Sequence, residues 1–120
     1  MTEKILVLED DPFIALDMES LLEEAGYDVL GPVASSRAAL KLLDDEGAAP
    51  DCALLDFFVS GGTSEFVARE LGRRDVPFVL VTGNKSAARD ALDDKDLLIR
   101  SKPVRPARIV ADVQDMLAAA

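Results

Sequence analysis

Side chains that could bind a metal ion or an anion follow four apolar segments of the chain. They are the acidic run Glu9-Asp10-Asp11 after residues 4–8, Asp56 after 51–55, Thr82 after 77–81 and Lys102 after 96–101. If the four segments are strands of one parallel sheet, their polar ends meet at its carboxyl edge, where open α/β sheets bind ligands. Carboxylates, one hydroxyl and one ammonium in the same cleft suit a divalent metal ion together with a phosphoryl group.

The elements that would position these side chains can be read from the alternation of apolar and amphipathic segments. The expected strands are 4–9, 28–33, 51–56, 76–82 and 96–101. The expected helices are 12–25, one that begins after Ser35 or Ser36 and is broken by Gly47–Pro50, one capped by Thr63 or Ser64, 84–93 and 105–118. Residues 57–63 are expected to form a Gly-containing loop. Right-handed crossovers then give an α/β fold, a doubly wound (βα)₅ parallel sheet of flavodoxin-like order 2-1-3-4-5.

Each expected helix has a stripe of apolar residues that should face the sheet. The stripes comprise Phe13, Ile14, Leu21, Leu22 and Ala25 in the first helix, Leu40, Leu42 and Leu43 in the second, Phe66, Val67 and Leu71 in the third, and Ile109, Val113, Met116 and Leu117 in the last. The fourth helix offers mostly alanine and should be loosely held. Asp11 is expected to cap the first helix, with Pro12 at its first position.

Composition narrows the classes of function. A length of 120 residues fits one domain, and the net charge of −10 argues against binding nucleic acid. Histidine is absent, which excludes a Ser-His-Asp triad and His metal ligands. Cys52 is the single cysteine and lies in an apolar run, so we expect a buried thiol in a reducing compartment. No apolar run approaches the roughly 20 residues that cross a membrane, and no signal peptide is visible. We therefore expect a cytoplasmic protein.

The polar strand ends also carry a family resemblance. Ile5-Leu6-Val7-Leu8-Glu9-Asp10-Asp11, Leu54-Leu55-Asp56, Val79-Leu80-Val81-Thr82-Gly83 and Ser101-Lys102-Pro103 resemble, in order and spacing, a response regulator receiver domain spanning residues 1–120. The resemblance implies that Asp10 and Asp56 bind Mg²⁺ directly, Glu9 binds it through water, and the main-chain carbonyl of Phe58 supplies another ligand. It implies that Asp56 accepts a phosphoryl group, assisted by Thr82 and Lys102, with Pro103 in a cis-proline turn.

Simpler roles stay open for these residues. The acidic run could serve as a helix cap, Asp56 could cap the following turn, and Lys102 could be a solvated lysine. A cap, however, explains one acid and not three. A phosphatase of the haloacid dehalogenase class would need a second acid where Phe58 stands, and a flavodoxin would place flavin phosphate beside an acidic loop. Both alternatives are disfavoured.

Three positions depart from the usual receiver pattern. Ile99 replaces the aromatic switch residue of the fifth strand, so the usual coupling between Thr82 and an aromatic ring is not expected. The stretch Pro77–Asn84 resembles the Pro-Phe-x-x-x-Thr-Gly-Tyr subfamily of stand-alone alphaproteobacterial receivers, although Asn84 replaces its tyrosine. Phe58 stands where receivers tune loss of the phosphoryl group. It is expected either to restrict the attacking water or to pack against the third helix or a partner.

The resulting interpretation is a single-domain response regulator of a two-component system, not an enzyme beyond its own phosphorylation and dephosphorylation. Its phosphodonor would be a sensor histidine kinase, for example of the HWE type, or a phosphotransfer protein. It would signal as a monomer or weak dimer by protein contact, as relay, phosphate sink or kinase feedback element. The expected contact face includes Ile99, Arg100, Arg105 and Arg108, whose arginines could equally be merely solvated. The alternative is a receiver-like adaptor that binds a partner without phosphorylation.

Overall fold

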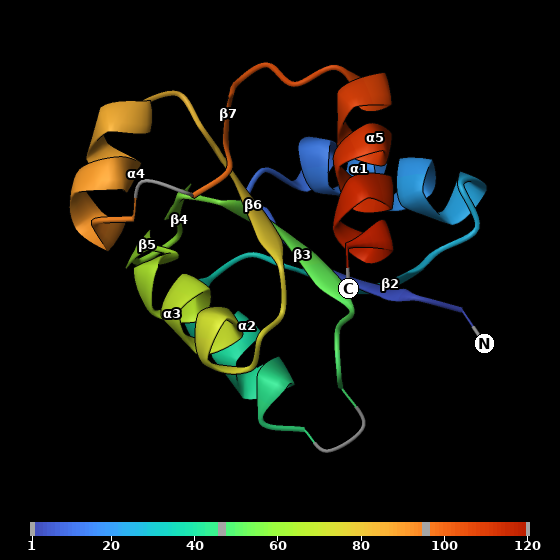
Figure 1. The fold of residues 1–120 in the computed structure, drawn as a ribbon, viewed down its shortest axis with the longest axis horizontal. Coiled ribbons are helices and arrows are strands. Elements are labelled where there is room, and N and C mark those ends of the chain that lie inside the picture. Colours follow the sequence, from blue (N-terminus) through green and yellow to red (C-terminus); the bar gives the residue numbers. More distant parts are fainter. Residues whose placement is uncertain (1, 46–47, 95–96, 120) are drawn as a thin grey trace.

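The computed structural model describes residues 2–45, 48–94 and 97–119, and these form a parallel sheet between two layers of helices (Figure 1). The elements are β1 Lys4–Leu8, α1 Pro12–Glu24, β2 Asp28–Val33, α2 Ser36–Leu43, β3 Cys52–Asp56, β4 Phe58–Val59, β5 Gly62–Thr63, α3 Glu65–Arg73, β6 Phe78–Thr82, α4 Lys85–Leu92, β7 Ile99–Ser101 and α5 Pro106–Ala118. The described strands of the main sheet have the order β2-β1-β3-β6-β7, which confirms the predicted topology.

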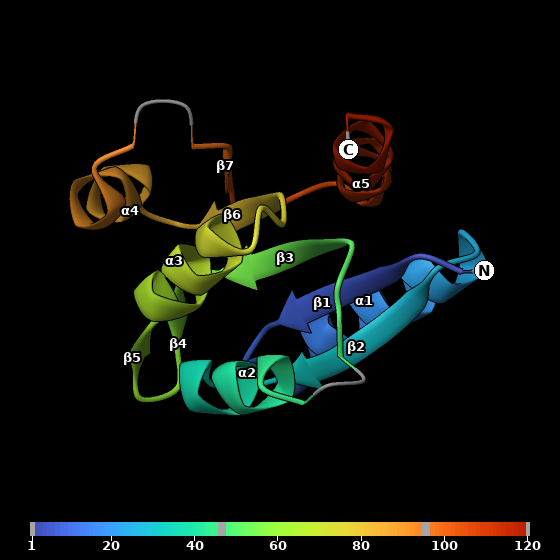
Figure 2. The same ribbon diagram turned by 60° about the horizontal axis from the view of Figure 1, so that its bottom comes forward.

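Different helices cover the two faces of the sheet, and each strand contributes side chains to both faces because successive side chains alternate. Leu6 and Leu8 of β1 point into a core cluster shared with α2, α3 and α4. Ile5 and Val7 point into the opposite cluster, which α1 and α5 complete. Figure 2 shows the same arrangement, with α2, α3 and α4 along one side of the strands and α1 and α5 along the other. All five residues of β3 are buried, as expected for a central strand covered on both faces.

The first and third helices face the sheet with a different set of residues from the one expected. In α1 the buried residues are Ala15 and Leu22, while Phe13, Ile14 and Ala25 are exposed. Successive residues of an α-helix are about 100° apart, so Phe13 lies roughly 160° round the helix from Ala15. In α3 the buried stripe is Val67, Ala68 and Leu71, and Phe66 is 69% exposed. The prediction that Phe13 and Phe66 belong to the core was wrong, because it gave more weight to their hydrophobicity than to their position around the helix.

The other helical predictions are closer to the structure. Leu43 is buried and Leu40 and Leu42 are partly buried, and α5 faces the sheet through Ile109, Val113 and Met116 with Leu117 partly buried. Asp11 caps α1 by accepting hydrogen bonds from the Phe13 and Ile14 N–H groups. Ser35 caps α2 through the Ala38 N–H. The expected helix break at Gly47 and the first residue of the expected strand 96–101 lie outside the described residues.

Residues 57–63 form a small antiparallel hairpin, not a simple loop. Its strands β4 and β5 pair Phe58 with Thr63 and Val59 with Gly62. The hairpin is joined to α2, because the Ser36 hydroxyl donates a 2.6 Å hydrogen bond to the carbonyl of Thr63 and Ser35 bridges to Ser60. The segment that leaves Asp56 is therefore held in one place by its neighbours.

Two further expectations concern the single cysteine and the length of the helices. Cys52 is fully buried, and burial raises the pKa of its thiol to about 12, so the thiol stays protonated at neutral pH. Within the described parts of the chain, every helix is too short or too polar to span a bilayer.

Candidate functional site

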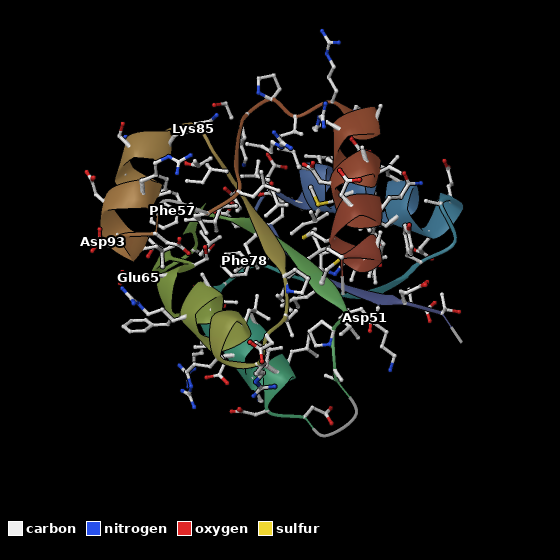
Figure 3. All side chains as sticks on the ribbon, in the orientation of Figure 1. Asp51, Phe57, Glu65, Phe78, Lys85 and Asp93 are labelled. Carbon is white, nitrogen blue, oxygen red and sulfur yellow. The ribbon has the colours of Figure 1, made fainter. Side chains whose placement is uncertain are left out.

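The sheet register brings the polar strand ends together. Leu8 of β1 lies opposite Leu55 of β3, so Glu9 and Asp56 are the next neighbours along the two strands. On the other side of Asp56, the N–H of Lys102 donates a 3.0 Å hydrogen bond to the carbonyl of Thr82. The four predicted positions therefore converge at the carboxyl edge of the sheet. In Figure 3, the label of Phe57 marks the residue that directly follows this end of β3.

Lys102 is the cation of the site. Its Nζ lies 2.7 Å from Oδ2 of Asp56 and 3.3 Å from Oε1 of Glu9. Both carboxylates are almost fully buried, with exposed fractions of 6% for Asp56 and 4% for Glu9, whereas Lys102 is partly exposed. Two buried carboxylates repel each other unless a positive charge lies between them. Lys102 supplies that charge.

The pKa values of Glu9 and Lys102 are both raised, but for different reasons. Burial raises the pKa of the Glu9 carboxyl, and hydrogen bonding to Asp56 raises it further against the opposing pull of the Asp11 N–H and Lys102. Burial alone would lower the pKa of Lys102, but hydrogen bonds and charge attraction from Asp56 and Glu9 outweigh burial and raise it. Lys102 thus stays charged at neutral pH, and Glu9 holds its proton more tightly than an exposed glutamate.

The donor set suits a hard divalent cation. One carboxylate oxygen from each of Glu9, Asp10 and Asp56 lies within 4.8 Å of the others. Two oxygens bound to one Mg²⁺ ion at 2.0–2.1 Å lie at most about 4 Å apart, so a small contraction of this cluster accommodates the ion. Asp10 is exposed and offers its oxygens from the solvent side. All ligand types are oxygen, which favours Mg²⁺ over softer metals.

A bulge in β2 fixes the height of Glu9 above the sheet. The pairing of β1 with β2 shifts register between Leu6 and Leu8, next to Gly31 and the cis peptide bond to Pro32. The Glu9 N–H then bonds the carbonyl of Val33 at 2.9 Å. Gly31 has a φ of +95°, and a Cβ there would come within 2.7 Å of the Val33 nitrogen. Glycine is required at this position.

Thr82 is buried at the end of β6, and its hydroxyl is already engaged. Its Oγ1 accepts a 3.0 Å hydrogen bond from the Asn84 N–H. Asn84 in turn caps α4, because its Oδ1 accepts the Ala87 N–H at 3.1 Å. The side chain expected to contact a phosphoryl group is therefore connected to the first turn of α4. Gly83 between them leaves open space where a side chain would stand.

Phe58 occupies the rim of the site. It opens the hairpin two residues after Asp56, is 49% exposed, and packs edge-on against Phe57 with ring centroids 5.0 Å apart. The ring of Phe58 therefore packs on the ring of the preceding residue. The hairpin itself was missed from sequence, although Gly61-Gly62 between Val59 and Thr63 is a turn signal.

An apolar cavity of about 430 Å³ adjoins the acidic cluster. Glu9 and Lys102 form its polar end, and Ile14, Met18, Val81, Val104 and Ile109 line the remainder together with Pro103. The Lys102–Pro103 peptide bond is cis, as the resemblance implied.

Arg100 of β7 and Asp112 of α5 form an ion pair that was not expected from the sequence. Arg100 donates two hydrogen bonds, of 2.8 and 2.7 Å, to the carboxylate of Asp112, which is 2% exposed. Ile99, expected on the contact face, is 3% exposed and belongs to the core cluster of α2, α3 and α4. The alternation of β7 places Ile99 and Arg100 on opposite faces of the sheet.

The fold and the site together define an α/β domain with an acidic, lysine-containing cleft at the carboxyl edge of a parallel sheet. Residues 5–114 match the family model of the response regulator receiver domain, and the chain belongs to this family. It is therefore a module of two-component signalling.

Several known proteins are similar to the chain. It is 29% identical over 119 residues to the phyllosphere-induced regulator PhyR of Methylorubrum extorquens, covering 98% of this chain and 44% of PhyR. It is 30% identical to the transcriptional regulatory protein AruR of Pseudomonas aeruginosa, covering 98% of this chain and 50% of AruR. The chain thus spans about half the length of these curated relatives.

Two solved structures show the same architecture over nearly their whole length. A response regulator receiver protein from Sinorhizobium medicae superposes with a TM-score of 0.86 at 28% identity, covering 98% of this chain and 96% of that one. SdrG from Sphingomonas melonis superposes with a TM-score of 0.77 at 32% identity, covering 97% of each chain.

Proposed function

We propose that the chain accepts a phosphoryl group on Asp56 from a histidine kinase or a phosphotransfer protein and passes the signal on by protein contact. The observation that carries this proposal is the position of Lys102, whose Nζ lies 2.7 Å from Asp56 within a buried cluster of carboxylates. A purely structural ion pair would not need two further acids beside it. A receiver needs them to hold a cation next to the acceptor.

The transfer requires few groups from the protein. An oxygen of Asp56 attacks phosphorus, a new P–O bond forms, and the bond from phosphorus to the donor's imidazole nitrogen breaks; the imidazole keeps the electron pair. Lys102, adjacent to Asp56, offsets the negative charge of the transferring group. The Thr82 hydroxyl, which now donates a 3.5 Å contact to the Asn84 carbonyl, would turn and donate to a phosphoryl oxygen instead. Positioning and charge compensation of this kind account for most of the catalysis in phosphoryl transfer.

Magnesium fits the same cluster. Asp10 and Asp56 would hold the ion directly, Glu9 through water, and the Phe58 main-chain carbonyl would complete the protein's share. When bound, Mg²⁺ supplies positive charge to the phosphoryl oxygens. Burial, and then the nearby Asp56, raise the pKa of Glu9, and a cation beside these carboxylates would offset both effects.

The partner is proposed from the sequence of β6 and the residues after it. Pro77-Phe78 followed by Thr82-Gly83 matches most of the Pro-Phe-x-x-x-Thr-Gly-Tyr pattern, so we propose a histidine kinase of the HWE or a related type as phosphodonor. The domain would act in the cytoplasm as a monomer or weak dimer. The relay, phosphate-sink and feedback roles all use the same chemistry at Asp56.

The test is phosphorylation by a small-molecule donor. The wild-type protein with acetyl phosphate and Mg²⁺ should gain one phosphoryl group by intact mass, and the adduct should be labile in base. Asp56→Asn should gain none. Asp45→Asn, which changes an exposed acid just beyond the C-cap of α2, serves as the charge-matched control and should react like wild type. If wild type remains unmodified with this donor and with a panel of kinases, the domain is an adaptor that works without phosphorylation.

A further inference from the structure

Helix α4 contributes little to the core. Ala88 is its buried residue among those described, with Ala87, Ala91 and Leu92 partly buried against the cluster. Alanine side chains bury little apolar surface, so the hydrogen bonds at the two ends of α4 carry a large share of what holds it in place. Figure 3 labels Lys85 and Asp93 at these ends.

The carboxyl end of α4 is bound by an arginine from the neighbouring helix. Nη2 of Arg69 in α3 donates a 3.1 Å hydrogen bond to the carbonyl of Ala91. The same guanidinium is oriented by Glu65, whose Oε1 accepts hydrogen bonds of 2.9 and 3.2 Å from it. Carbonyls in the last turn of a helix lack intrahelical donors and carry the negative end of the dipole, so a cation there stabilises the helix.

The amino end of α4 is bound by the site. The Asn84 N–H donates to Thr82, and Asn84 caps the helix through Ala87. If the Thr82 side chain rotates to donate its hydroxyl proton to a phosphoryl oxygen, Oγ1 moves away from the Asn84 N–H and that hydrogen bond breaks. The first turn of α4 would then rearrange while Arg69 still held its last turn.

We propose that Arg69 is a latch that holds α4 in the arrangement of the unphosphorylated protein. The latch rests on the proposed function, because it assigns a conformational consequence to phosphorylation of Asp56. Movement of α4 relative to α3 must break the bond from Arg69 to Ala91, so this bond stabilises the unloaded arrangement. By linkage, a contact made in the unloaded state lowers the affinity of Asp56 for a phosphoryl ligand by the same factor. One charge-assisted hydrogen bond corresponds to about a fivefold change.

The experiment compares two arginines of α3. Arg69→Met removes the latch. Arg73→Met is the matched control, because Arg73 lies on the same helix, is also exposed, and pairs with Glu70 of its own helix at 3.1 Å. Each variant is titrated with beryllium trifluoride, a phosphoryl mimic, in the presence of Mg²⁺. Amide hydrogen exchange of residues 85–92 is followed in the free proteins. We expect Arg69→Met to bind the mimic about fivefold more tightly and to exchange faster in α4, while Arg73→Met matches wild type.

The outcomes separate the two proposals. Equal affinities for all three proteins, or weaker binding by Arg69→Met, would overturn the latch and leave the proposed function standing. Faster exchange in α4 without a change in affinity would likewise make Arg69 a structural cap and no latch. If wild type binds no beryllium trifluoride, the proposed function fails and the latch fails with it.

Discussion

The ammonium group of Lys102 lies 2.7 Å from Oδ2 of Asp56, although 46 residues separate them in the chain. Both groups stand at strand ends, and only the pairing of β3 with β6 and of β6 with β7 brings them together. In the protein without a metal ion, Lys102 is the counter-charge that contacts the buried acids Glu9 and Asp56. A metal ion would therefore share these oxygens with a cation that the chain already provides.

Replacing Lys102 should separate its structural and chemical roles. Lys102→Met leaves the acids without their counter-charge, so the metal-free protein should lose about 1–2 kcal/mol of stability, a value reduced by the partial exposure of the lysine. The rate of phosphorylation by acetyl phosphate should fall about 100-fold or more. Urea unfolding and intact-mass kinetics measure the two effects. Lys41→Met, at an exposed position of α2, should change neither.

The stability of the metal-free protein should depend on the ionisation of Glu9. A carboxyl whose pKa is raised by folding stabilises the protein below the unfolded value of 4.5, and this contribution is lost as the pH rises through the folded value. Glu9→Gln removes that loss. The variant should therefore gain stability relative to wild type as the pH rises from 4 to 7, by on the order of 1 kcal/mol. Thermal unfolding across this pH range is the measurement, and parallel curves for the two proteins would contradict the assignment. Added Mg²⁺ should stabilise wild type more than Glu9→Gln.

Gly26 and Gly31 have the same φ angle, so replacing each by alanine separates the cost of backbone strain from the cost of a steric clash. Gly26 and Gly31 both have a φ of +95°, but a Cβ at Gly26 meets no atom within 4 Å, whereas one at Gly31 meets the Val33 nitrogen at 2.7 Å and the Val7 carbonyl at 3.1 Å. Gly26→Ala should cost about 1 kcal/mol. Gly31→Ala should cost at least about 2 kcal/mol more, because backbone atoms must shift. Chemical denaturation of both variants measures the difference, and equal costs would show that the bulge adjusts freely.

The aromatic ring of Phe58 should affect how long a phosphoryl group persists. If the ring restricts the water that attacks phospho-Asp56, Phe58→Asn will shorten the lifetime several-fold. The phosphorylated protein is freed of donor and the loss of phosphate is timed. Phe66→Asn changes another exposed phenylalanine, on α3, and should leave the lifetime as it is. An unchanged rate in Phe58→Asn would assign Phe58 to packing against Phe57 or a partner.

A pair of serines tests hydrogen bonding around the hairpin. Ser64 is fully buried, and its Oγ has no hydrogen-bond partner among the described residues. Ser64→Ala should therefore leave stability unchanged or raise it by about 1 kcal/mol. Ser36→Ala removes the 2.6 Å bond to the Thr63 carbonyl and should cost about 1 kcal/mol. Opposite signs in thermal unfolding are expected, and a loss in both variants would indicate a water or other partner at Ser64.

The parts of the fold that follow from local chemistry could be predicted from the sequence. The unbroken apolar run before Asp56 predicts a central strand, and Asp11-Pro12 predicts a helix start; both are confirmed. Helical phase was less secure, because Phe13 and Phe66 are apolar side chains that the fold leaves exposed. Exposure of single large residues costs little, so composition alone does not exclude it.

Details of the site depend on register and therefore could not be read from the residues. The convergence of Glu9, Asp56 and Lys102 follows from strand order, but the engagement of the Thr82 hydroxyl by Asn84 depends on the turn between β6 and α4. The hairpin after Asp56 is stabilised by Ser35 and Ser36, which belong to a segment more than 20 residues earlier. Ile99 is buried because α4 covers its side of the edge strand. This packing could not be foreseen from the charged residues that surround Ile99 in the sequence.

The bidentate contact between Arg100 and Asp112 has a consequence for selectivity at the outer edge of the sheet. Because the guanidinium is neutralised within the molecule, a binding protein that approaches β7 from the α5 side finds no bare positive charge at Arg100. Discrimination between rival binding proteins on that side would then depend on the exposed arginines Arg105 and Arg108 at the start of α5.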